Sequence, residues 1–125
     1  VKHTGIDLLA NAGTEVIAPA NGTVVSTSRA SKGTGNTVVI NHGNGYVTKY
    51  MYLGDILVRQ GQSVKLGDAI ARVGVTGMSF GPHLHYEVLK DGENMDPVYY
   101  FYSSMSPKMN MELMIKTANT GQSLD

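Results

Sequence analysis

The sequence predicts a mainly β fold, an antiparallel sheet or sandwich, with one short C-terminal helix. Glycine accounts for 15 of the 125 residues, well above the usual share of about 7%, which indicates many turns. The first hundred residues divide into short runs rich in Val, Ile, Thr and Tyr, and no run has a helical period or the length of a crossover helix. Strands connected by short turns pair antiparallel.

The expected strands follow one another closely along the chain. We expect them at 15–18, 22–28, 36–41, 46–53, 69–74 and 83–89. Asn44 and Gly45 separate two of these runs, and Asn-Gly between β-rich segments is the strongest short hairpin signal. Asp91 and Gly92 follow the last run and predict another turn.

The C-terminal tail is predicted to be helical. Ser106 suits the cap of a helix, and Pro107 suits its first turn. We therefore expect one helix over 107–118, packed on the sheet, with a partner-binding role for its methionines as the alternative. The expected organisation is a β domain over 1–102 and a C-terminal helical extension of the same domain over 103–125.

Composition excludes several classes of protein. Ten basic and ten acidic side chains cancel, so the chain lacks the clustered positive charge of a nucleic-acid binder. No apolar run reaches about 18 residues, so we expect no membrane span in this chain. Cysteine is absent, which removes disulfides, thiol catalysis and cysteine-based zinc sites. The chain begins at Val1, which is typical of a mature fragment or an excised domain.

Two short patterns contain side chains that bind metals. His3 and Asp7 lie four residues apart, and His83 and His85 lie two apart on an expected strand, where both point to the same face. Imidazoles and a carboxylate are zinc ligands, and three protein ligands leave a position open for water. Each pattern alone is weakly specific; the two together are equally compatible with a metal site and with ordinary hydrogen-bonded histidines. His42, beside the Asn-Gly turn, we interpret as a turn residue.

Several blocks together carry a family resemblance that covers roughly residues 1–100. The loop before His83 is rich in glycine and would allow close approach of a bound chain. The blocks are His3–Asp7, Glu15–Val24, Gly35–Tyr46, Gly74–Gly77 and Gly81–Val88. In this order they resemble the LytM/lysostaphin-type zinc metallopeptidases.

The resemblance implies a site, a substrate and a location. Its metal ligands fall on His3, Asp7 and His85, which would hold one zinc ion, and its catalytic histidine beside the metal falls on His83. It implies an antiparallel sheet that forms a substrate groove. Family members cleave glycyl cross-bridges or stem peptides of bacterial peptidoglycan outside the cytoplasm. We therefore expect an extracytoplasmic protein, secreted or anchored through upstream sequence, with peptidoglycan peptides as partners.

One position departs from the family pattern. The family usually has a second catalytic histidine where this chain has Tyr52, within Tyr50–Leu53. A phenol titrates near pH 10 and is no base at neutral pH, but it can donate a hydrogen bond to an oxyanion. Tyr52 therefore predicts either transition-state stabilisation, with His83 handling the proton, or a weak or silent relative.

Two rival functions remain open at this point. The silent relative would bind cell wall or activate another hydrolase, although the retained ligands favour the enzyme. A biotinyl- or lipoyl-type carrier domain would explain the strand-turn rhythm of 18–24 and 58–68, but no lysine lies at the hairpin tip that such a carrier modifies. The sequence leaves the oligomeric state and the cleaved bond open.

Overall fold

The computed structural model describes residues 5–74, 83–95 and 122–124, and for the first and last strands it describes the backbone and its pairing. The strands are β1 (Ile6–Leu9), β2 (Glu15–Ile17), β3 (Gly22–Ser28), β4 (Asn36–Gly43), β5 (Tyr46–Ile56), β6 (Ser63–Val64), β7 (Ala69–Val73), β8 (His83–Lys90), β9 (Glu93–Met95) and β10 (Gln122–Leu124). Among these residues there is no helix, and the predicted mainly β class is confirmed. The helix expected over 107–118 lies outside the described residues.

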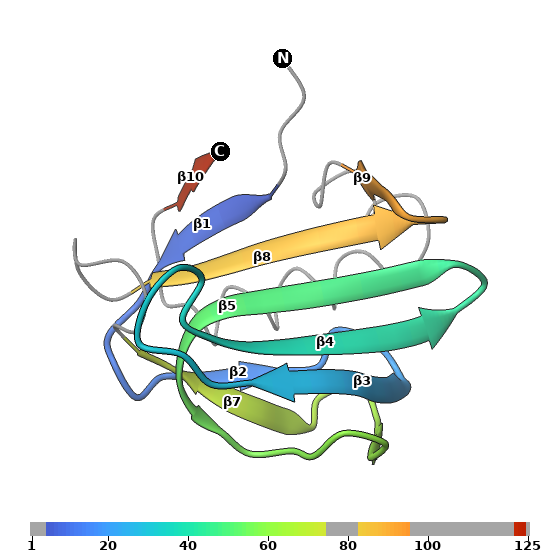
Figure 1. The fold of residues 1–125 in the computed structure, drawn as a ribbon, viewed down its shortest axis with the longest axis horizontal. Helices are drawn as coiled ribbons and strands as arrows, with labels where there is room; N and C mark the ends of the chain where they lie inside the picture. The colour runs from blue at the N-terminus through green and yellow to red at the C-terminus, as the bar shows by residue number, and fades with distance from the viewer. Residues whose placement is uncertain (1–4, 75–82, 96–121, 125) are drawn as a thin grey trace.

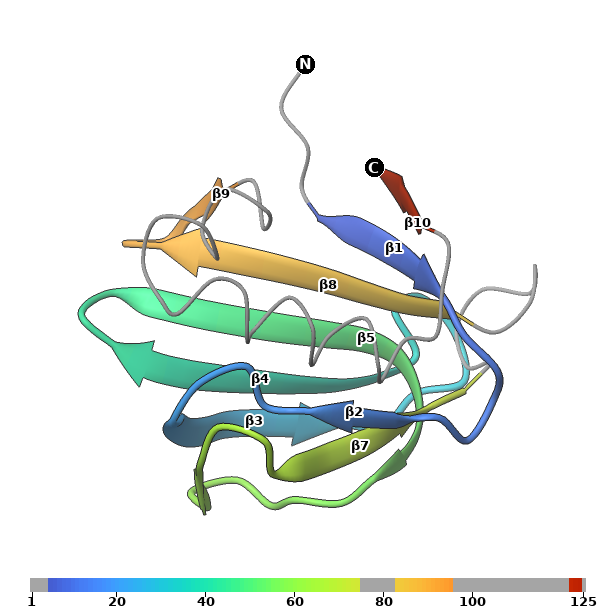
Figure 2. The ribbon, with the colours of Figure 1, turned by 180° about the vertical axis from the view of Figure 1, so that it is seen from behind.

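The strands form one antiparallel sheet that curls back on itself. Its main path runs β10-β1-β8-β5-β4-β3-β6, while β7 pairs with both β5 and β2, and β9 pairs with β8. The pair β2 and β7 lies behind β3 in Figure 1 and in front of it in Figure 2, so this pair covers one face of the main path. The long strand β5 joins the two layers because it pairs with β4, β8 and β7.

The hydrophobic core fills the space between these layers. Val16 of β2 and Ile70 of β7 are fully buried, as are Tyr50 of β5 and Leu84 of β8. The rest of the core comprises Ala10, Ala18, Val24, Val38, Ile40, Leu53, Val58, Val64, Ala71, Val73, Tyr86 and Val88. Thr48 and Tyr50 of β5 are buried on one strand face, as are Leu84, Tyr86 and Val88 of β8.

Turn chemistry fixes two of the hairpins. Asn44 and Gly45, between β4 and β5, have φ angles of 54° and 85°. Asp91 and Gly92, between β8 and β9, have φ angles of 53° and 84°. Two successive positive φ angles define the type I′ turn, whose twist matches that of the flanking strands. Both turns lie where the sequence predicts them.

The end of the chain adds a strand that the sequence did not predict. β10 pairs with β1, with Ile6 opposite Leu124 and Asp7 opposite Ser123. β1 is therefore held between β8 and β10, which gives it partners on both sides.

In the parts of the chain that the structure describes, no helix is long and apolar enough to cross a membrane.

Candidate active site

The alternation of β8 places two histidines together on the face away from the core. Leu84 and Tyr86 point into the core and are at most 1% exposed. His83 and His85 take the opposite face, as their spacing predicts, and are themselves only 3% and 6% exposed. Two imidazoles buried this deeply on one strand face are uncommon in a structural role, because histidine is usually only partly buried.

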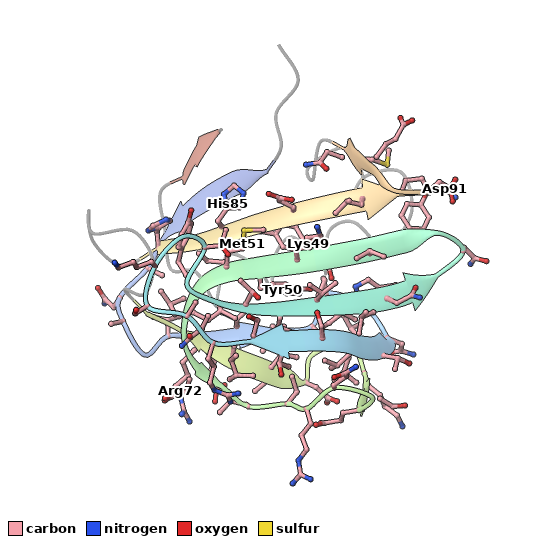
Figure 3. All side chains as sticks on the ribbon, viewed as in Figure 1. Lys49, Tyr50, Met51, Arg72, His85 and Asp91 are labelled. Atoms are coloured by element: carbon pink, nitrogen blue, oxygen red, sulfur yellow. The ribbon has the colours of Figure 1, made fainter. Side chains whose placement is uncertain are left out.

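Strand pairing brings Asp7 beside this histidine pair. In the β1–β8 register Asp7 lies directly opposite His85, and on the other side of β8 Met51 of β5 is opposite His85. Figure 3 shows Met51 and His85 side by side on these neighbouring strands. Directly opposite residues have Cβ atoms about 5 Å apart. The register thus unites two blocks that lie far apart in the sequence.

The metal ligands that the resemblance implies lie partly outside the described residues. His3 lies outside them, and Asp7 is described by its backbone. Among the side chains that the structure describes, no three His, Asp or Glu residues are grouped as a metal site. The assignment of His3, Asp7 and His85 as zinc ligands therefore stays a prediction.

Tyr52 reaches the histidine face through a break in strand alternation. Regular alternation after Tyr50, which is buried in the core, would put Tyr52 in the core as well. Tyr52 instead has a φ of +61°. Val38 of β4 pairs with Tyr50 of β5, but Asn36 pairs with Leu53, so three residue steps along β5 lie opposite two along β4. This is a β-bulge, which re-aims a side chain. Leu53 then returns to the core.

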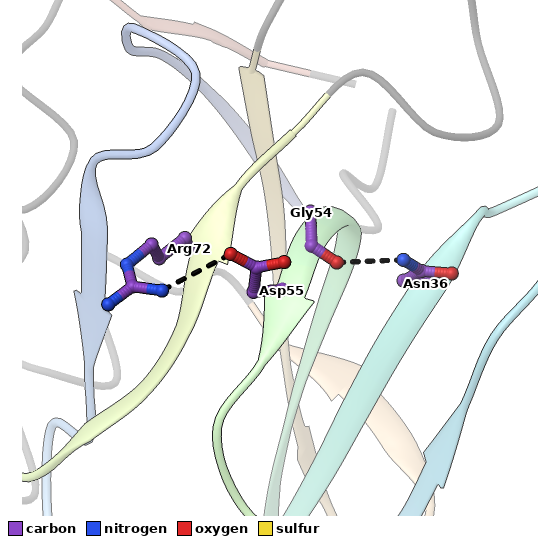
Figure 4. Close-up of polar contacts among 4 residues, drawn as sticks. All are labelled: Asn36, Gly54, Asp55 and Arg72. Carbon is purple, nitrogen blue, oxygen red and sulfur yellow. Dashed lines mark hydrogen bonds and ion pairs between the residues drawn. The ribbon is translucent and has the colours of Figure 1, made fainter.

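Hydrogen bonds hold the backbone on both sides of this bulge. The Tyr52 amide donates to the Thr34 carbonyl at 2.9 Å, and its carbonyl accepts from the Gly74 amide at 3.2 Å. The Asn36 side chain donates to the Gly54 carbonyl at 2.8 Å, as Figure 4 shows. A positive φ at a non-glycine residue costs about 1–3 kcal/mol and persists only where its surroundings enforce it. These three hydrogen bonds hold the backbone of Tyr52 in its positive-φ conformation.

A further contact fixes the strand segment beyond the bulge. Arg72 of β7 donates to the carboxylate of Asp55 at 3.2 Å (Figure 4), but both side chains are largely exposed. An exposed pair of this kind contributes at most about 1 kcal/mol. The ion pair adds a weak contact between β5 and β7 and has little effect on the geometry of the site.

The bulge places the Tyr52 ring against the histidines. Its centroid lies 4.6 Å from that of His83, with 41° between the planes, and 6.2 Å from that of His85. The phenol and two imidazoles therefore share one small site. The resemblance predicted Tyr52 at this site, but no pattern in the sequence showed that a bulge puts it there.

Sequence reasoning missed one acidic residue of the site. His85 Nε2 donates to Oε2 of Glu87 at 2.9 Å, and the two side chains are only 8% and 14% exposed. The available signal was the same two-residue spacing that unites His83 and His85, because Glu87 follows on the same strand face.

His42 belongs to a separate polar network. Its Nδ1 donates to the Asn21 carbonyl at 2.8 Å, and its Nε2 accepts from the Thr48 hydroxyl at 2.7 Å. That hydroxyl accepts in turn from the Tyr50 phenol at 2.7 Å. Burial lowers the pKa of His42 below 6.5, against the opposing effect of the bond to Asn21. These bonds give His42 a structural role at the end of β4, where it borders a hollow of about 500 Å³.

Comparison with known proteins identifies relatives of the same fold. The chain is 44% identical over 95 residues to the peptidoglycan DD-endopeptidase ShyC of Vibrio cholerae, covering 76% of this chain and 22% of the relative. A zinc-containing peptidase from Vibrio cholerae superimposes with a TM-score of 0.71 at 40% identity, over 74% of this chain and 28% of the other. The chain thus spans about a fifth of the length of such a curated relative.

A second solved structure matches over most of its own length. The catalytic domain of lysostaphin from Staphylococcus simulans superimposes with a TM-score of 0.73 at 32% identity, over 81% of this chain and 80% of that domain. The profile of peptidase family M23 matches residues 1–97, which include every residue that the sequence singled out for the site. This chain belongs to peptidase family M23.

Proposed function

We propose that this chain is a zinc-dependent metalloendopeptidase that cleaves peptide bonds in bacterial cell-wall peptidoglycan, in a glycyl cross-bridge or a stem peptide. The single observation that carries the proposal is the bulge at Tyr52. The bulge holds Tyr52 in a strained backbone conformation and brings the centroid of its ring to 4.6 Å from that of His83. Strain of this kind is concentrated at functional sites.

The residues present fit a zinc ion. His3, Asp7 and His85 would hold it, and this donor set of two imidazoles and one carboxylate is a common catalytic combination. The fit is supported by the backbone register, which sets Asp7 opposite the buried His85. When bound, zinc supplies a Lewis acid that polarises a carbonyl and makes water nucleophilic near neutral pH.

His83 and Tyr52 would divide the remaining work. His83 is the general base that takes the proton of the attacking water and then gives it to the departing amine. The Tyr52 hydroxyl donates a hydrogen bond to the oxyanion that forms on the scissile carbonyl. Because the bulge and its hydrogen bonds fix the phenol in advance, this donor needs little reorganisation during the reaction.

The substrate and location follow from relatives. Peptidoglycan endopeptidases such as ShyC match this chain over three quarters of its length. We therefore propose peptidoglycan peptides as partners and an extracytoplasmic location. The same comparison favours catalysis over the alternative of a silent, cell-wall-binding relative.

Mass spectrometry of cleavage products tests the proposal. Zinc-supplemented protein is incubated with directly cross-linked and glycine-bridged muropeptides, beside a His83→Ala variant and a Glu93→Gln control at an exposed position of β9. We expect new fragments from the wild type and the control, and a rate lower by about 10²- to 10⁴-fold for His83→Ala. Wild-type protein that holds stoichiometric zinc yet yields no fragment from either substrate would support the silent relative.

A further inference from the structure

We propose that Glu87 is a positioning residue for His85: its carboxylate accepts the Nε2 proton of His85, fixes the tautomer and ring orientation, and assigns Nδ1 as the atom that binds the metal. This inference rests on the proposed zinc function. It adds to that function a residue whose role is to orient a ligand. Glu87 acts through His85, which its carboxylate contacts.

The contact between the two side chains is short and shielded from water. His85 Nε2 and Glu87 Oε2 are 2.9 Å apart, and the side chains are 8% and 14% exposed. Both residues project from the same face of β8, where residues two apart are neighbours. A charge-assisted hydrogen bond in such surroundings is stronger than one at the surface.

Glu87 makes this contact although another partner is available. Lys49 of β5 lies directly opposite Glu87 in the β5–β8 register, where opposite charges usually pair. Within the described part of the chain, no ion pair joins Lys49 and Glu87, and the recorded partner of the carboxylate is His85. The carboxylate is therefore directed along its own strand, toward the site.

The backbone of Gly5 packs over this contact. A Cβ atom at Gly5 would lie 2.9 Å from His85 Nε2 and 2.9 Å from Glu87 Cγ. Only a residue without a side chain allows β1 to approach the pair so closely. The Gly5 backbone thus helps to keep water from the hydrogen bond and limits rotation of the ring.

The chemistry of the pair assigns the role of each ring nitrogen. An ionised carboxylate only accepts hydrogen bonds, so Nε2 must carry the proton. In a neutral imidazole the other nitrogen, Nδ1, then bears the lone pair that a metal requires. Carboxylates that accept from a metal-bound histidine raise its basicity, and their removal typically weakens metal binding by about 10- to 100-fold.

Glu87→Gln tests the assignment by two measurements. The amide of this variant can donate as well as accept, so it no longer enforces one tautomer. We expect zinc affinity, measured by competition with a chromogenic chelator, to fall by about 10- to 100-fold. We also expect nitrogen-15 spectra of the metal-free protein to show the Nε2–H tautomer of His85 in the wild type and added Nδ1–H tautomer in the variant. Glu93→Gln, the same change on β9, should match the wild type in both.

Glu87→Asp separates the hydrogen bond from the charge. The variant keeps the negative charge but is one methylene shorter, so it should lose the contact and bind zinc as weakly as Glu87→Gln. Full affinity in Glu87→Asp with weak binding in Glu87→Gln would show that charge alone matters and would overturn the inference.

The outcomes distinguish this inference from the proposed function. If the wild type binds zinc and Glu87→Gln binds it equally well with an unchanged His85 tautomer, the positioning role is wrong and the zinc function stands. If the wild type binds no zinc, the proposed function fails, and the metal role of Glu87 fails with it.

Discussion

Gly5→Ala should weaken metal binding by disturbing the contact between β1 and β8. The added Cβ would lie 2.5 Å from the carbonyl oxygen of Tyr86 and 2.9 Å from His85 Nε2. The carbonyl belongs to the paired backbone and cannot turn aside. An ordinary contact between the added Cβ and the Tyr86 carbonyl oxygen is about 3.4 Å, compared with 2.5 Å here. The start of β1 would therefore have to move by about 0.9 Å. Gly5 directly precedes β1, and Asp7 is the second residue of that strand, so Asp7 moves as well.

The size of the expected effect follows from this displacement. Overpacking of this kind costs about 1–3 kcal/mol of folding stability. Disturbing the partner of a ligating histidine weakens metal binding by about 10- to 100-fold. Chelator competition on the folded protein measures zinc affinity, and chemical unfolding of the metal-free protein measures stability separately.

Gly22→Ala provides the matched control. Its added Cβ would lie 2.7 Å from the Asn41 carbonyl oxygen and 2.9 Å from His42 Nδ1, which is as crowded as Gly5 but away from the site. We expect similar destabilisation and unchanged zinc affinity. Equal zinc affinity in Gly5→Ala and the wild type, or an equal loss in both glycine variants, would show that close packing at Gly5 does not support metal binding.

Three further changes have defined outcomes. Tyr52→Phe should lower the cleavage rate by about 10²- to 10³-fold with zinc affinity unchanged; a rate equal to that of the wild type would remove the phenol from the mechanism. Burial lowers the pKa of His42 below 6.5, so the unfolded chain takes up its proton first as the pH falls. The free energy of unfolding should therefore be highest above about pH 6.5 and decrease below it, and His42→Gln should flatten this slope in pH-dependent denaturation. Gly74→Ala would force a Cβ to 2.5 Å from the Gly54 Cα and should destabilise the protein by about 1–3 kcal/mol, seen as a lower Tm.

Local chemistry made much of the sheet predictable from sequence. Asn44 and Asp91 tolerate a positive φ angle, and each is followed by a glycine. This pair of residues predicts the two hairpin turns. The shared face of His83 and His85 follows from the two-residue period of a strand. Both inferences depend only on neighbours in the chain, where the rules of backbone geometry apply directly.

The remaining features depend on contacts between distant segments. The approach of Asp7 to His85 needs the β1–β8 register, and the position of Tyr52 needs a bulge that breaks alternation. For Glu87, a neighbour along its own strand and a neighbour across the sheet are both possible, and the fold selects His85 over Lys49. The pairing of β10 with β1 likewise has no local signature. The tail helix, the domain bounds and the ligand role of His3 stay predictions.

Removal and return of zinc tests whether cleavage depends on the metal. Protein stripped by a chelator is assayed on cross-linked muropeptides before and after one equivalent of zinc is added, with His85→Ala treated in parallel. We expect no fragments from the stripped protein, recovery of cleavage with zinc in the wild type, and no recovery in His85→Ala. Equal cleavage by the stripped and the zinc-loaded wild type would contradict it.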